Sequence, residues 1–282
     1  NLHKKKNRLL CHYCGYSLPA NLLCNCCGST NLAPVGFGTE RVEEEVTSLL
    51  PSAKIARIDS DIASDRKQFL VILQKMRERQ IDILVGTQMI AKGLHFPGVS
   101  LVGVVWADGG LAFPDYRAAE RTYQLIAQVT GRAGRGSVEG KVIIQTMQPE
   151  HYAIALASSH NYQDLAEKEL RIRRSAGFPP FVRLVSIKVE GKTEQHAREA
   201  AGRVGASARN WCAAHTKGQG IEILGPAPSP IEKIRDRYRW HVLIKGRNIN
   251  EMHRLVGYIQ ENHCGNRTDE KIIIDIDPEN ML

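Results

Sequence analysis

Four cysteines near the start of the chain are spaced like the ligands of a metal ion. Cys11 and Cys14 form a pair with two residues between them, and Cys24 and Cys27 form a second such pair. Two thiolate pairs can enclose a tetrahedral Zn²⁺ ion, with Zn–S bonds of about 2.3 Å, and four thiolates leave no open position for catalysis. The pattern therefore predicts a structural zinc site. A redox dithiol or a chance group of buried thiols is the alternative.

A second group of polar residues follows a predicted buried strand at residues 81–85. Thr87 and Gln88 come directly after Gly86, at the carboxyl end of this strand, and Lys92 lies a few residues further on. Ligands of parallel sheets bind at this end of the strands, where backbone N–H groups and hydroxyls suit phosphate oxygens. The turn is a candidate phosphate-binding site. An ordinary strand-to-helix loop would have the same residues if it stood alone.

A third motif ends a predicted helix at residues 116–129. Its sequence, Gln-Val-Thr-Gly-Arg-Ala-Gly-Arg, runs from Gln128 to Arg135. Arg132 and Arg135 are three residues apart between glycines, and such a fork can hold the oxygens of a transferred phosphoryl group, as an arginine finger does. A basic surface turn is the alternative interpretation.

The last candidate site is a basic stretch near the end of the chain. Arg237, Arg239 and Arg247 lie in and after a predicted strand, with Tyr238 and Trp240 among them. Side chains alternate along a strand, so we expect Arg237 and Arg239 on one face and the two aromatic rings on the other. The stretch predicts an anionic partner, either DNA or an acidic peptide. A solvated basic face with Trp240 in the core is the alternative.

The elements that must position these residues alternate between strand and helix in the first half of the chain. Short apolar strands separated by amphipathic helices predict an α/β fold with a parallel sheet covered on both faces. A helical stretch then leads to a βαββαβ run, typical of an α+β sandwich. Ser64 is expected to cap the second helix. The predicted strands are residues 55–58, 81–85, 101–105, 141–145, 181–189, 221–224, 238–245 and 271–277, and the helices are residues 39–50, 64–76, 116–129, 151–174, 193–214 and 250–261.

Length and composition limit the classes of protein to which the chain can belong. The chain has 282 residues, of which 43% are hydrophobic and 24% charged, an ordinary globular composition. No apolar run approaches the roughly 20 residues that span a bilayer, and the start has no apolar region of a signal peptide. Seven cysteines, an odd number, disfavour a disulfide framework. The formal charge of +8 is compatible with nucleic acid, and the first residue, Asn1, suggests a fragment or a processed product.

Four domains follow from these patterns. We expect a small Cys-rich zinc module at residues 1–38 and an α/β lobe at residues 39–150. A helical connector at residues 151–180 ends at Pro179-Pro180 and leads to the sandwich at residues 181–282.

Taken together, the motifs resemble those of the superfamily 2 helicases. The second RecA-like lobe of those enzymes carries a Gly-Thr-Gln motif that contacts DNA and a final Gln-x-x-Gly-Arg-x-Gly-Arg motif, as found at residues 86–88 and 128–135. The order of the cysteine pairs, these two motifs and Gly-Phe-Pro-Pro-Phe at residues 177–181 is similar to the primosomal protein N′ (PriA) family of replication-restart helicases. The similarity extends to residues 275–278 and covers nearly the whole chain.

The resemblance implies the C-terminal part of an ATP-dependent 3′→5′ DNA helicase that restarts stalled replication forks by primosome assembly. The lobe would then be a RecA-like doubly wound parallel sheet. Its partners would be branched and single-stranded DNA, single-stranded-DNA-binding protein and other primosome proteins, in the bacterial cytoplasm at the nucleoid and without a membrane. Arg237, Arg239 and Arg247 would serve DNA or the acidic tail of single-stranded-DNA-binding protein.

The resemblance also implies roles for the motif residues. Arg132 and Arg135 would stabilise charge on the phosphoryl group of ATP bound with Mg²⁺. Gln128 would position nucleotide or water, and Gly93 would join the two arginines at the nucleotide. The residues expected on the DNA backbone are Thr87, Gln88 and Lys92.

Two features of the sequence depart from that family. The P-loop lysine and the Asp-Glu box of the first lobe are missing, so the chain alone is predicted to be inactive; Gly191-Lys192-Thr193 is no substitute, because a P-loop needs Gly where Ser186 stands. The family also has four cysteine pairs, and only two occur here, which leaves open one shared zinc site or two incomplete ones. The competing interpretation is a non-catalytic, zinc-dependent nucleic-acid-binding module.

Overall fold

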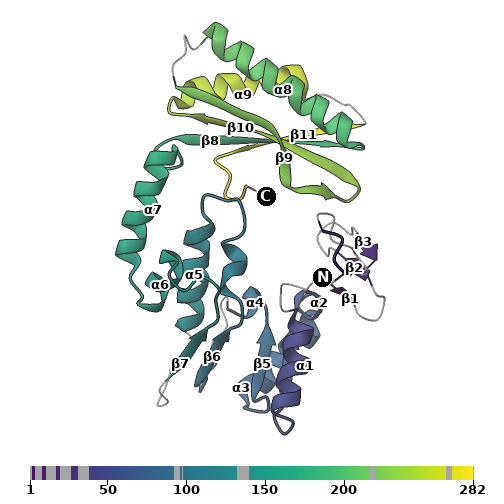
Figure 1. Cartoon of the computed structure of the whole chain (residues 1–282), viewed down its shortest axis with the longest axis vertical. Helices are drawn as coiled ribbons and strands as arrows, with labels where there is room; N and C mark the ends of the chain where they lie inside the picture. Colours follow the sequence, from purple (N-terminus) through teal and green to yellow (C-terminus); the bar gives the residue numbers. More distant parts are fainter. Residues whose placement is uncertain are drawn as a thin grey trace. The chain divides into compact units, whose positions relative to one another are not determined.

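The chain folds into two compact units. The structure is a computed structural model that describes residues 2–3, 8–10, 17–19, 27–30, 38–91, 96, 98–131, 140–215, 220–264 and 269–281. Figure 1 labels its helices and strands. Unit 1 contains residues 1–32, 114–116 and 167–282, and unit 2 contains residues 33–113 and 117–166.

Unit 2 contains two pairs of parallel strands. β4 (Ile55–Ile58) pairs with β5 (Ile83–Gly86), with Ile55 opposite Ile83. β6 (Leu101–Val104) pairs with β7 (Lys141–Ile144), with Leu101 opposite Lys141. Each pair is connected through helices, as parallel strands require. The helices on the first pair are α1 (Thr39–Leu49), α2 (Ser60–Ser64) and α3 (Arg66–Arg77).

The expectation of one parallel sheet covered on both faces does not hold for the described residues. The two strand pairs form separate two-stranded sheets, because no described strand joins β5 to β6. In β6 and β7 the side chains alternate between partly buried and exposed, and Leu101 and Ile143 are 57% and 52% exposed. These strands are therefore covered on one face only.

The cap of α3 also differs from the expectation. Asp65 caps this helix, and its carboxylate accepts hydrogen bonds from the backbone N–H groups of Lys67 at 3.0 Å and Gln68 at 3.2 Å. Ser64 is the last residue of α2 instead. A carboxylate one residue later reaches two unpaired N–H groups of the first turn and suits the positive end of the helix dipole.

An apolar cluster in unit 2 lies around α5 (Ala118–Thr130). Tyr123 and Ile126 of this helix pack with Ala153 and Ile154 of α6 (Tyr152–Ser158) and with Ala107 of the 3₁₀ helix η2 (Ala107–Gly110). The expected single helix at residues 151–174 is two helices, α6 and α7 (Tyr162–Ala176). Residues 162–166 at the start of α7 belong to unit 2 and the remainder to unit 1.

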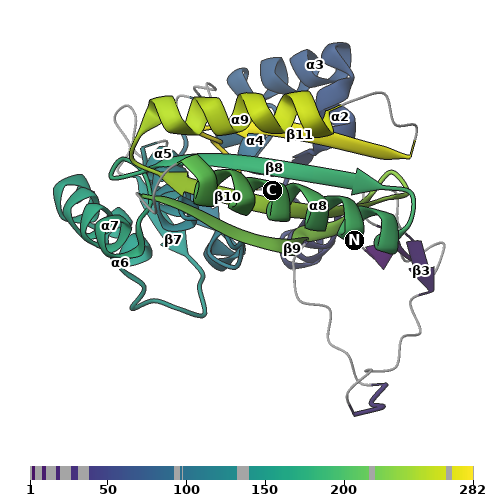
Figure 2. The same ribbon diagram turned by 90° about the horizontal axis from the view of Figure 1, so that it is seen from above.

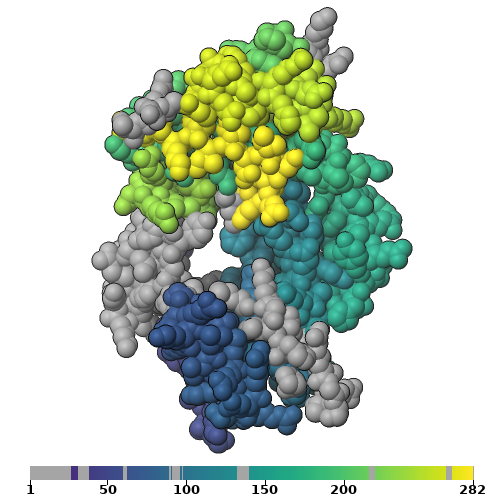
Figure 3. All heavy atoms as spheres, turned by 180° about the vertical axis from the view of Figure 1, so that it is seen from behind, coloured from purple at the N-terminus to yellow at the C-terminus, as the bar shows by residue number. Residues whose placement is uncertain are grey.

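Most of unit 1 is a four-stranded antiparallel sheet with two helices. Strand β8 (Arg183–Gly191) is followed by α8 (Glu194–His215), and α9 (Ile249–His263) precedes β11 (Glu270–Ile276). The sheet has the order β11-β8-β10-β9. Figures 1 and 2 show both helices on the same face of this sheet, and Figure 3 shows α9 in yellow at the surface. The remaining strands are β9 (Ile221–Ile234) and β10 (Arg237–Gly246).

Unit 1 differs from the sequence expectation in strand β9 and in the Cys-rich region. β9 is longer than expected and runs through Pro226, Pro228 and Pro230. Proline lacks an N–H donor and is tolerated in an edge strand, and β9 is the last strand of the sheet order. The Cys-rich region contains a small antiparallel sheet that periodicity did not predict, formed by β1 (Leu2–His3), β2 (Arg8–Leu10) and β3 (Ser17–Pro19).

Within the described part of the chain, no helix has the length and apolar character to cross a membrane.

Candidate nucleotide and nucleic-acid site

The Gly-Thr-Gln turn lies at the carboxyl end of β5. A Cβ atom on Gly86 would come within 2.6 Å of the carbonyl oxygen of Ile58, so the close approach of β4 and β5 requires glycine here. Thr87 and Gln88 follow and are exposed, and Gln88 begins the short helix α4 (Gln88–Ala91). Lys92 and Gly93 lie outside the described residues. The glycine thus ends the strand so that two polar side chains face solvent.

The arginine motif begins in the last turn of α5. Gln128 is partly buried there, and the helix ends at Thr130. Gly131 follows as the C-cap, and its backbone N–H donates to the carbonyl oxygen of Ala127 at 3.2 Å. Arg132 and Arg135 lie outside the described residues. The described geometry is therefore that of a helix whose end leads directly into the two arginines.

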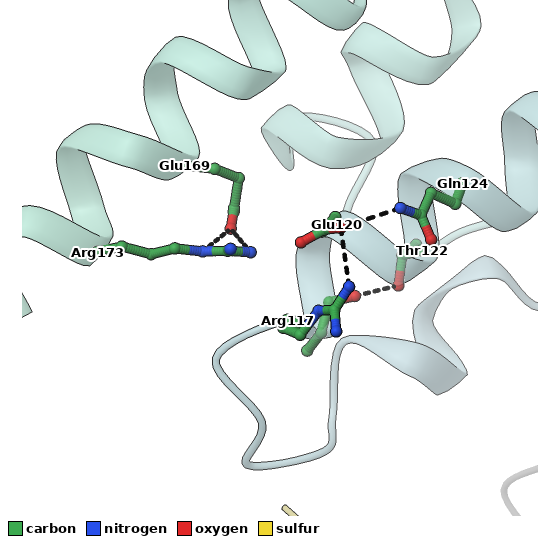
Figure 4. Close-up of polar contacts among 7 residues, drawn as sticks. Arg117, Glu120, Thr122, Gln124, Glu169 and Arg173 are labelled. Carbon is green, nitrogen blue, oxygen red and sulfur yellow. Dashed lines mark hydrogen bonds and ion pairs between the residues drawn. The ribbon is translucent and has the colours of Figure 1, made fainter. Parts of the chain in front are cut away.

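The first turns of α5 carry a polar chain that sequence reasoning missed. Arg117 pairs with Glu120, with 3.3 Å between Nη2 and Oε1, and Gln124 donates to the same oxygen at 3.0 Å (Figure 4). Thr122 is buried and donates to the carbonyl oxygen of Ala118 at 2.9 Å. A Cβ on Gly110 would come within 2.6 Å of the Thr122 hydroxyl. Arg117, Glu120 and Gln124 are three and four residues apart, and this helical spacing is the sequence signal that could have predicted their contacts.

Asp108 is a second buried polar residue that sequence reasoning left unassigned. Its carboxylate accepts hydrogen bonds from the Thr146 hydroxyl at 2.8 Å and the backbone N–H of Met147 at 2.9 Å, and the residue is 7% exposed. Burial alone would raise the pKa of Asp108, but these hydrogen bonds to the charged form outweigh it, and the pKa lies below its ordinary value. Asp108 thus ties η2 to the segment after β7.

The predicted zinc ligands lie mostly outside the described residues. Cys11, Cys14 and Cys24 are not described, and Cys27 is exposed and free of a disulfide. Within the described part of the chain, no three His, Cys, Asp or Glu side chains are grouped so that they could hold a metal. Gly28, after Cys27, has φ of +67°, the left-handed backbone that glycine readily adopts.

The three C-terminal arginines lie in different surroundings. Arg239 is buried, at 7% side-chain exposure, with its Nε atom 3.8 Å from Glu190 Oε1. Arg237 is partly buried two residues earlier, and Arg247 is exposed beyond the far end of β10. Eight residues of strand separate Arg239 from Arg247, roughly 26 Å. Trp240 packs against the core beneath α8 and α9, so the arginines do not form one rim around it.

The side chains of Lys192 and Thr193, in the sequence Gly191-Lys192-Thr193, make structural contacts. Lys192 forms an ion pair with Asp269, and the Thr193 hydroxyl accepts a hydrogen bond from the backbone N–H of His196 at the start of α8. The lysine and hydroxyl thus have local partners, which agrees with the expectation that this sequence is no phosphate loop.

The fold and these motifs define a class of protein: a helicase lobe of the RecA type with a Cys-rich region before it and an α/β domain after it. Three family models match these regions in that order. The PriA DNA helicase Cys-rich region domain matches residues 1–19, the helicase conserved C-terminal domain matches residues 32–137, and the primosomal protein N C-terminal domain matches residues 174–279.

Curated relatives agree with the three models. The replication restart protein PriA of Bacillus subtilis is 42% identical over 275 residues, which is 98% of this chain and 34% of that protein. The PriA proteins of Haemophilus influenzae and Treponema pallidum are 34% and 36% identical, and 99% of this chain aligns with 38% and 42% of their lengths. The chain belongs to the PriA family and matches its C-terminal part.

The chain spans between a third and somewhat over two fifths of the length of these relatives. A solved structure titled "De novo designed protein Foldit4" covers 35% of the chain with a TM-score of 0.27 and 14% identity, a likeness too small to argue from.

Proposed function

We propose that this chain supplies the second RecA-like lobe and the C-terminal domain of an ATP-dependent 3′→5′ DNA helicase that restarts stalled replication forks. The observation that carries the proposal is the arginine motif at the end of α5 within a region that matches the helicase conserved C-terminal domain. The curated relatives are replication restart proteins over nearly the whole chain. Such an enzyme acts on DNA in the bacterial cytoplasm.

In this proposal the nucleotide is bound between two lobes, and this chain contributes one side. Arg132 and Arg135 stabilise charge on the transferred phosphoryl group, and Gln128 orients nucleotide or water from the last turn of α5. Gly93 approaches the nucleotide with its backbone. ATP would carry Mg²⁺, whose ligands belong to the other lobe.

The DNA contacts are proposed at the carboxyl end of β5. Thr87 and Gln88 are exposed there and can donate hydrogen bonds to phosphate oxygens, and Lys92 would add a positive charge. Contacts of this kind hold the backbone and carry no sequence information, as a motor that travels along DNA requires. Branched and single-stranded DNA are both proposed substrates.

We propose zinc as a structural cofactor held by Cys11, Cys14, Cys24 and Cys27. A region this small cannot bury enough apolar surface to fold without a metal. The purified chain should contain zinc by elemental analysis, and a chelator should unfold the Cys-rich region while leaving unit 2 and the four-stranded sheet of unit 1 folded. A tightly held stoichiometric ion favours one shared site, and a labile substoichiometric ion favours two incomplete ones.

The decisive experiment measures DNA-stimulated ATP hydrolysis. The chain alone should show none, because the P-loop lobe is missing. In a protein that also carries the first lobe, Arg135→Ala should lower turnover by about 10³-fold, the effect of losing an arginine finger. The matched control is Arg77→Ala, an exposed arginine of α3 in the same lobe. If Arg135→Ala alters only DNA affinity, the finger role is wrong.

Retained DNA binding without any ATPase in the two-lobe protein would favour the competing function, a non-catalytic nucleic-acid-binding module. Arg247 is the exposed candidate for an acidic partner such as the tail of single-stranded-DNA-binding protein. Arg247→Ala should weaken binding of an acidic tail peptide more than Arg239→Ala, since Arg239 is buried. Other primosome proteins remain proposed partners without an assigned surface.

A further inference from the structure

Residues 114–116, between η2 and α5, belong to unit 1, although the chain on both sides of them belongs to unit 2. The ring of Tyr116 stacks on that of Phe178, with the ring centres 5.2 Å apart and the planes 6° from parallel. The backbone N–H of Met281 donates to the Asp115 carboxylate at 3.3 Å. Two successive residues of this segment are thus held by parts of unit 1 that are distant in the sequence.

A cation lies against each of the two stacked rings. The Cζ atom of Arg173, on α7, lies 5.2 Å from the centre of the Tyr116 ring. The Nζ atom of Lys245, on β10, lies 4.1 Å from the centre of the Phe178 ring. A cation within about 6 Å of a ring centre is attracted by the π electrons. These contacts form one group, which we call the ring cluster: Tyr116, Phe178, Arg173 and Lys245.

Both cations of the ring cluster are themselves fixed by hydrogen bonds. Arg173 donates from Nε and Nη2 to the largely buried Glu169 carboxylate, at 3.1 and 2.9 Å (Figure 4). Lys245 donates to the carbonyl oxygen of Ala176, at the end of α7, at 3.1 Å. A long side chain that is already held in one conformation loses little further entropy when it contacts a ring. The ring cluster is therefore an ordered anchor for Tyr116.

The helix that follows Tyr116 begins with a residue that cannot cap it. The N-cap of α5 is Arg117, and an arginine side chain has no acceptor for the unpaired N–H groups of the first turn. By contrast, Asp65 caps α3 and Asn248 caps α9, each by accepting from two backbone N–H groups. Helix ends without a capping side chain fray more readily. The start of α5 therefore depends on what holds the residues before it.

Tyr116 can hold that start because the connection along the chain is short. Ala118, the first residue of α5, comes two residues after Tyr116, a span of at most about 7 Å. From there the helix runs to Thr130, about 20 Å further at 1.5 Å per residue. Arg132 and Arg135 of the proposed nucleotide site follow directly in the sequence. The ring cluster thus precedes α5, and the arginine motif begins where α5 ends.

The helix between them is well enough held to transmit a constraint. Arg117, Glu120 and Gln124 are linked along its first turns by hydrogen bonds of 3.3 and 3.0 Å (Figure 4). Tyr123 and Ile126 are buried on its inner side. A rigid helix of about 20 Å moves its far end by about 1 Å when it tilts by about 3°. A misplacement of about 1 Å can lower the rate of a reaction about 100-fold.

We propose that Tyr116 is a positioning residue for ATP hydrolysis: the ring cluster fixes the start of α5, and α5 fixes the place from which the arginine motif reaches the nucleotide. The proposal rests on the function proposed above, in which Arg132 and Arg135 stabilise charge on the phosphoryl group. Tyr116 acts through the helix and touches neither nucleotide nor DNA. The other members of the ring cluster influence hydrolysis by the same route.

The first test uses the chain itself and needs no activity. Hydrogen exchange followed by mass spectrometry reports the opening of the first turns of α5, where Arg121 carries a hydrogen-bonded N–H. Phe178→Ala should speed exchange there about tenfold, because it removes the ring on which Tyr116 stacks. The matched control is Phe181→Ala, which removes a ring that faces Arg174 instead and should change this exchange less than about twofold.

A second substitution guards against loss of the fold in Phe178→Ala. Phe178→Leu keeps an apolar side chain without a ring and should speed exchange in α5 in the same way. Faster exchange in β8 without any change in α5 would show that the ring cluster only stabilises unit 1, and would overturn the proposal. Equal effects of Phe178→Ala and Phe181→Ala on α5 would overturn it as well.

The second test measures DNA-stimulated ATP hydrolysis in a protein that also carries the first lobe. Tyr116→Ala should lower kcat about tenfold and change KM for ATP less than about twofold, because a positioning residue acts on the transition state. Tyr116→Phe keeps the stacked ring and should retain at least about half of the turnover. Adding Phe178→Ala to Tyr116→Ala should lower turnover less than about twofold further, since both substitutions remove the same contact.

The outcomes separate this proposal from the function on which it rests. An unaltered two-lobe protein without DNA-stimulated hydrolysis would overturn the proposed function and this role together. Hydrolysis that is as fast in folded Tyr116→Ala as in the unaltered protein would overturn this role alone. Additive losses in the double variant would also overturn it, because Tyr116 would then act by a route other than Phe178.

Discussion

The C-terminal sandwich and the helicase lobe bury their apolar residues in different ways. In the sandwich, β8 and β10 are central strands, and Val185, Ile187 and Val242 pack beneath two helices in one continuous core. In the lobe, the described strands form two pairs, and Leu101 and Ile143 are more than half exposed. The sandwich thus has the larger closed core, whereas the lobe places polar turns at its strand and helix ends. The proposed nucleotide-binding residues belong to the unit with the smaller described core.

The largest expected effect tests this difference directly. Ile187→Ala removes a fully buried side chain from the sandwich and should lower the free energy of unfolding by about 4 kcal/mol. Ile143→Ala removes the same atoms from an exposed position of β7 and should cost less than about 1 kcal/mol. Urea denaturation, with hydrogen exchange to assign the transition to a unit, measures both. Similar costs would mean that the lobe is as closely packed as the sandwich.

The second prediction concerns a polar anchor in unit 1. Arg173 of α7 donates from Nε and Nη2 to Glu169, at 3.1 and 2.9 Å, and both side chains are largely buried (Figure 4). Its guanidinium also lies 5.2 Å from the centre of the Tyr116 ring, which stacks on Phe178. Arg173→Ala should cost about 3 kcal/mol, because it removes a charged, hydrogen-bonded partner from the buried Glu169 carboxylate.

The same helix offers a matched control for that prediction. Arg171 and Glu167 have the same spacing and a distance of 2.9 Å, but they are 78% and 71% exposed. Arg171→Ala should cost less than about 0.5 kcal/mol, since an exposed ion pair contributes little. If the two variants are equally stable in urea denaturation, burial is not what makes the Arg173 pair important.

The third prediction asks whether polar contacts hold the lobe where its core is small. Asp108→Ala should lower its stability by about 2 kcal/mol at neutral pH, because the N–H of Met147 and the Thr146 hydroxyl lose their partner. The control is Asp82→Ala, an exposed acid that accepts one hydrogen bond from the Lys54 N–H. A cost below that of Asp82→Ala would show that Asp108 is dispensable.

Low pH should remove the contribution of Asp108 to the free energy of unfolding. Its pKa is below its ordinary value in the folded chain, so its carboxylate stabilises the fold above the ordinary pKa, and this contribution is lost as pH falls through the lower folded value. Urea denaturation of the original chain and Asp108→Asn across this pH range should give curves that converge in acid. Parallel curves would contradict the assignment.

The smallest effect is expected at His241 in the sandwich. Its pKa is lowered in the folded chain, mainly by burial and then by Lys188 and Arg239, so the unfolded chain takes up a proton first as pH falls below the ordinary value. Stability should therefore decrease from pH 7.5 to 5.5, by less than about 1 kcal/mol because the side chain is partly exposed. His241→Asn should lose this dependence, whereas His253→Asn at an exposed position of α9 should keep it.

The sequence predicted the positions of the helices and strands better than it predicted the contacts between them. The strand at residues 55–58 was predicted with the bounds of β4, and α1 and β7 differ from expectation by one residue at one end. Apolar periodicity is a local property, so it survives without knowledge of the partners. The cap at Asp65, the break between α6 and α7, and the length of β9 depend on competing contacts and were missed.

What the sequence determined by itself was the family and the candidate site residues, because motif order and spacing can be read along the chain. Only the tertiary structure decided which arginines are accessible. Arg237, Arg239 and Arg247 look equivalent in the sequence, yet strand pairing buries Arg239 beside Glu190 and leaves Arg247 exposed. Cross-strand neighbours such as His241 and Lys188 are 53 residues apart in number and become adjacent through register alone. Burial and charge crowding arise from that pairing, and no local pattern encodes them.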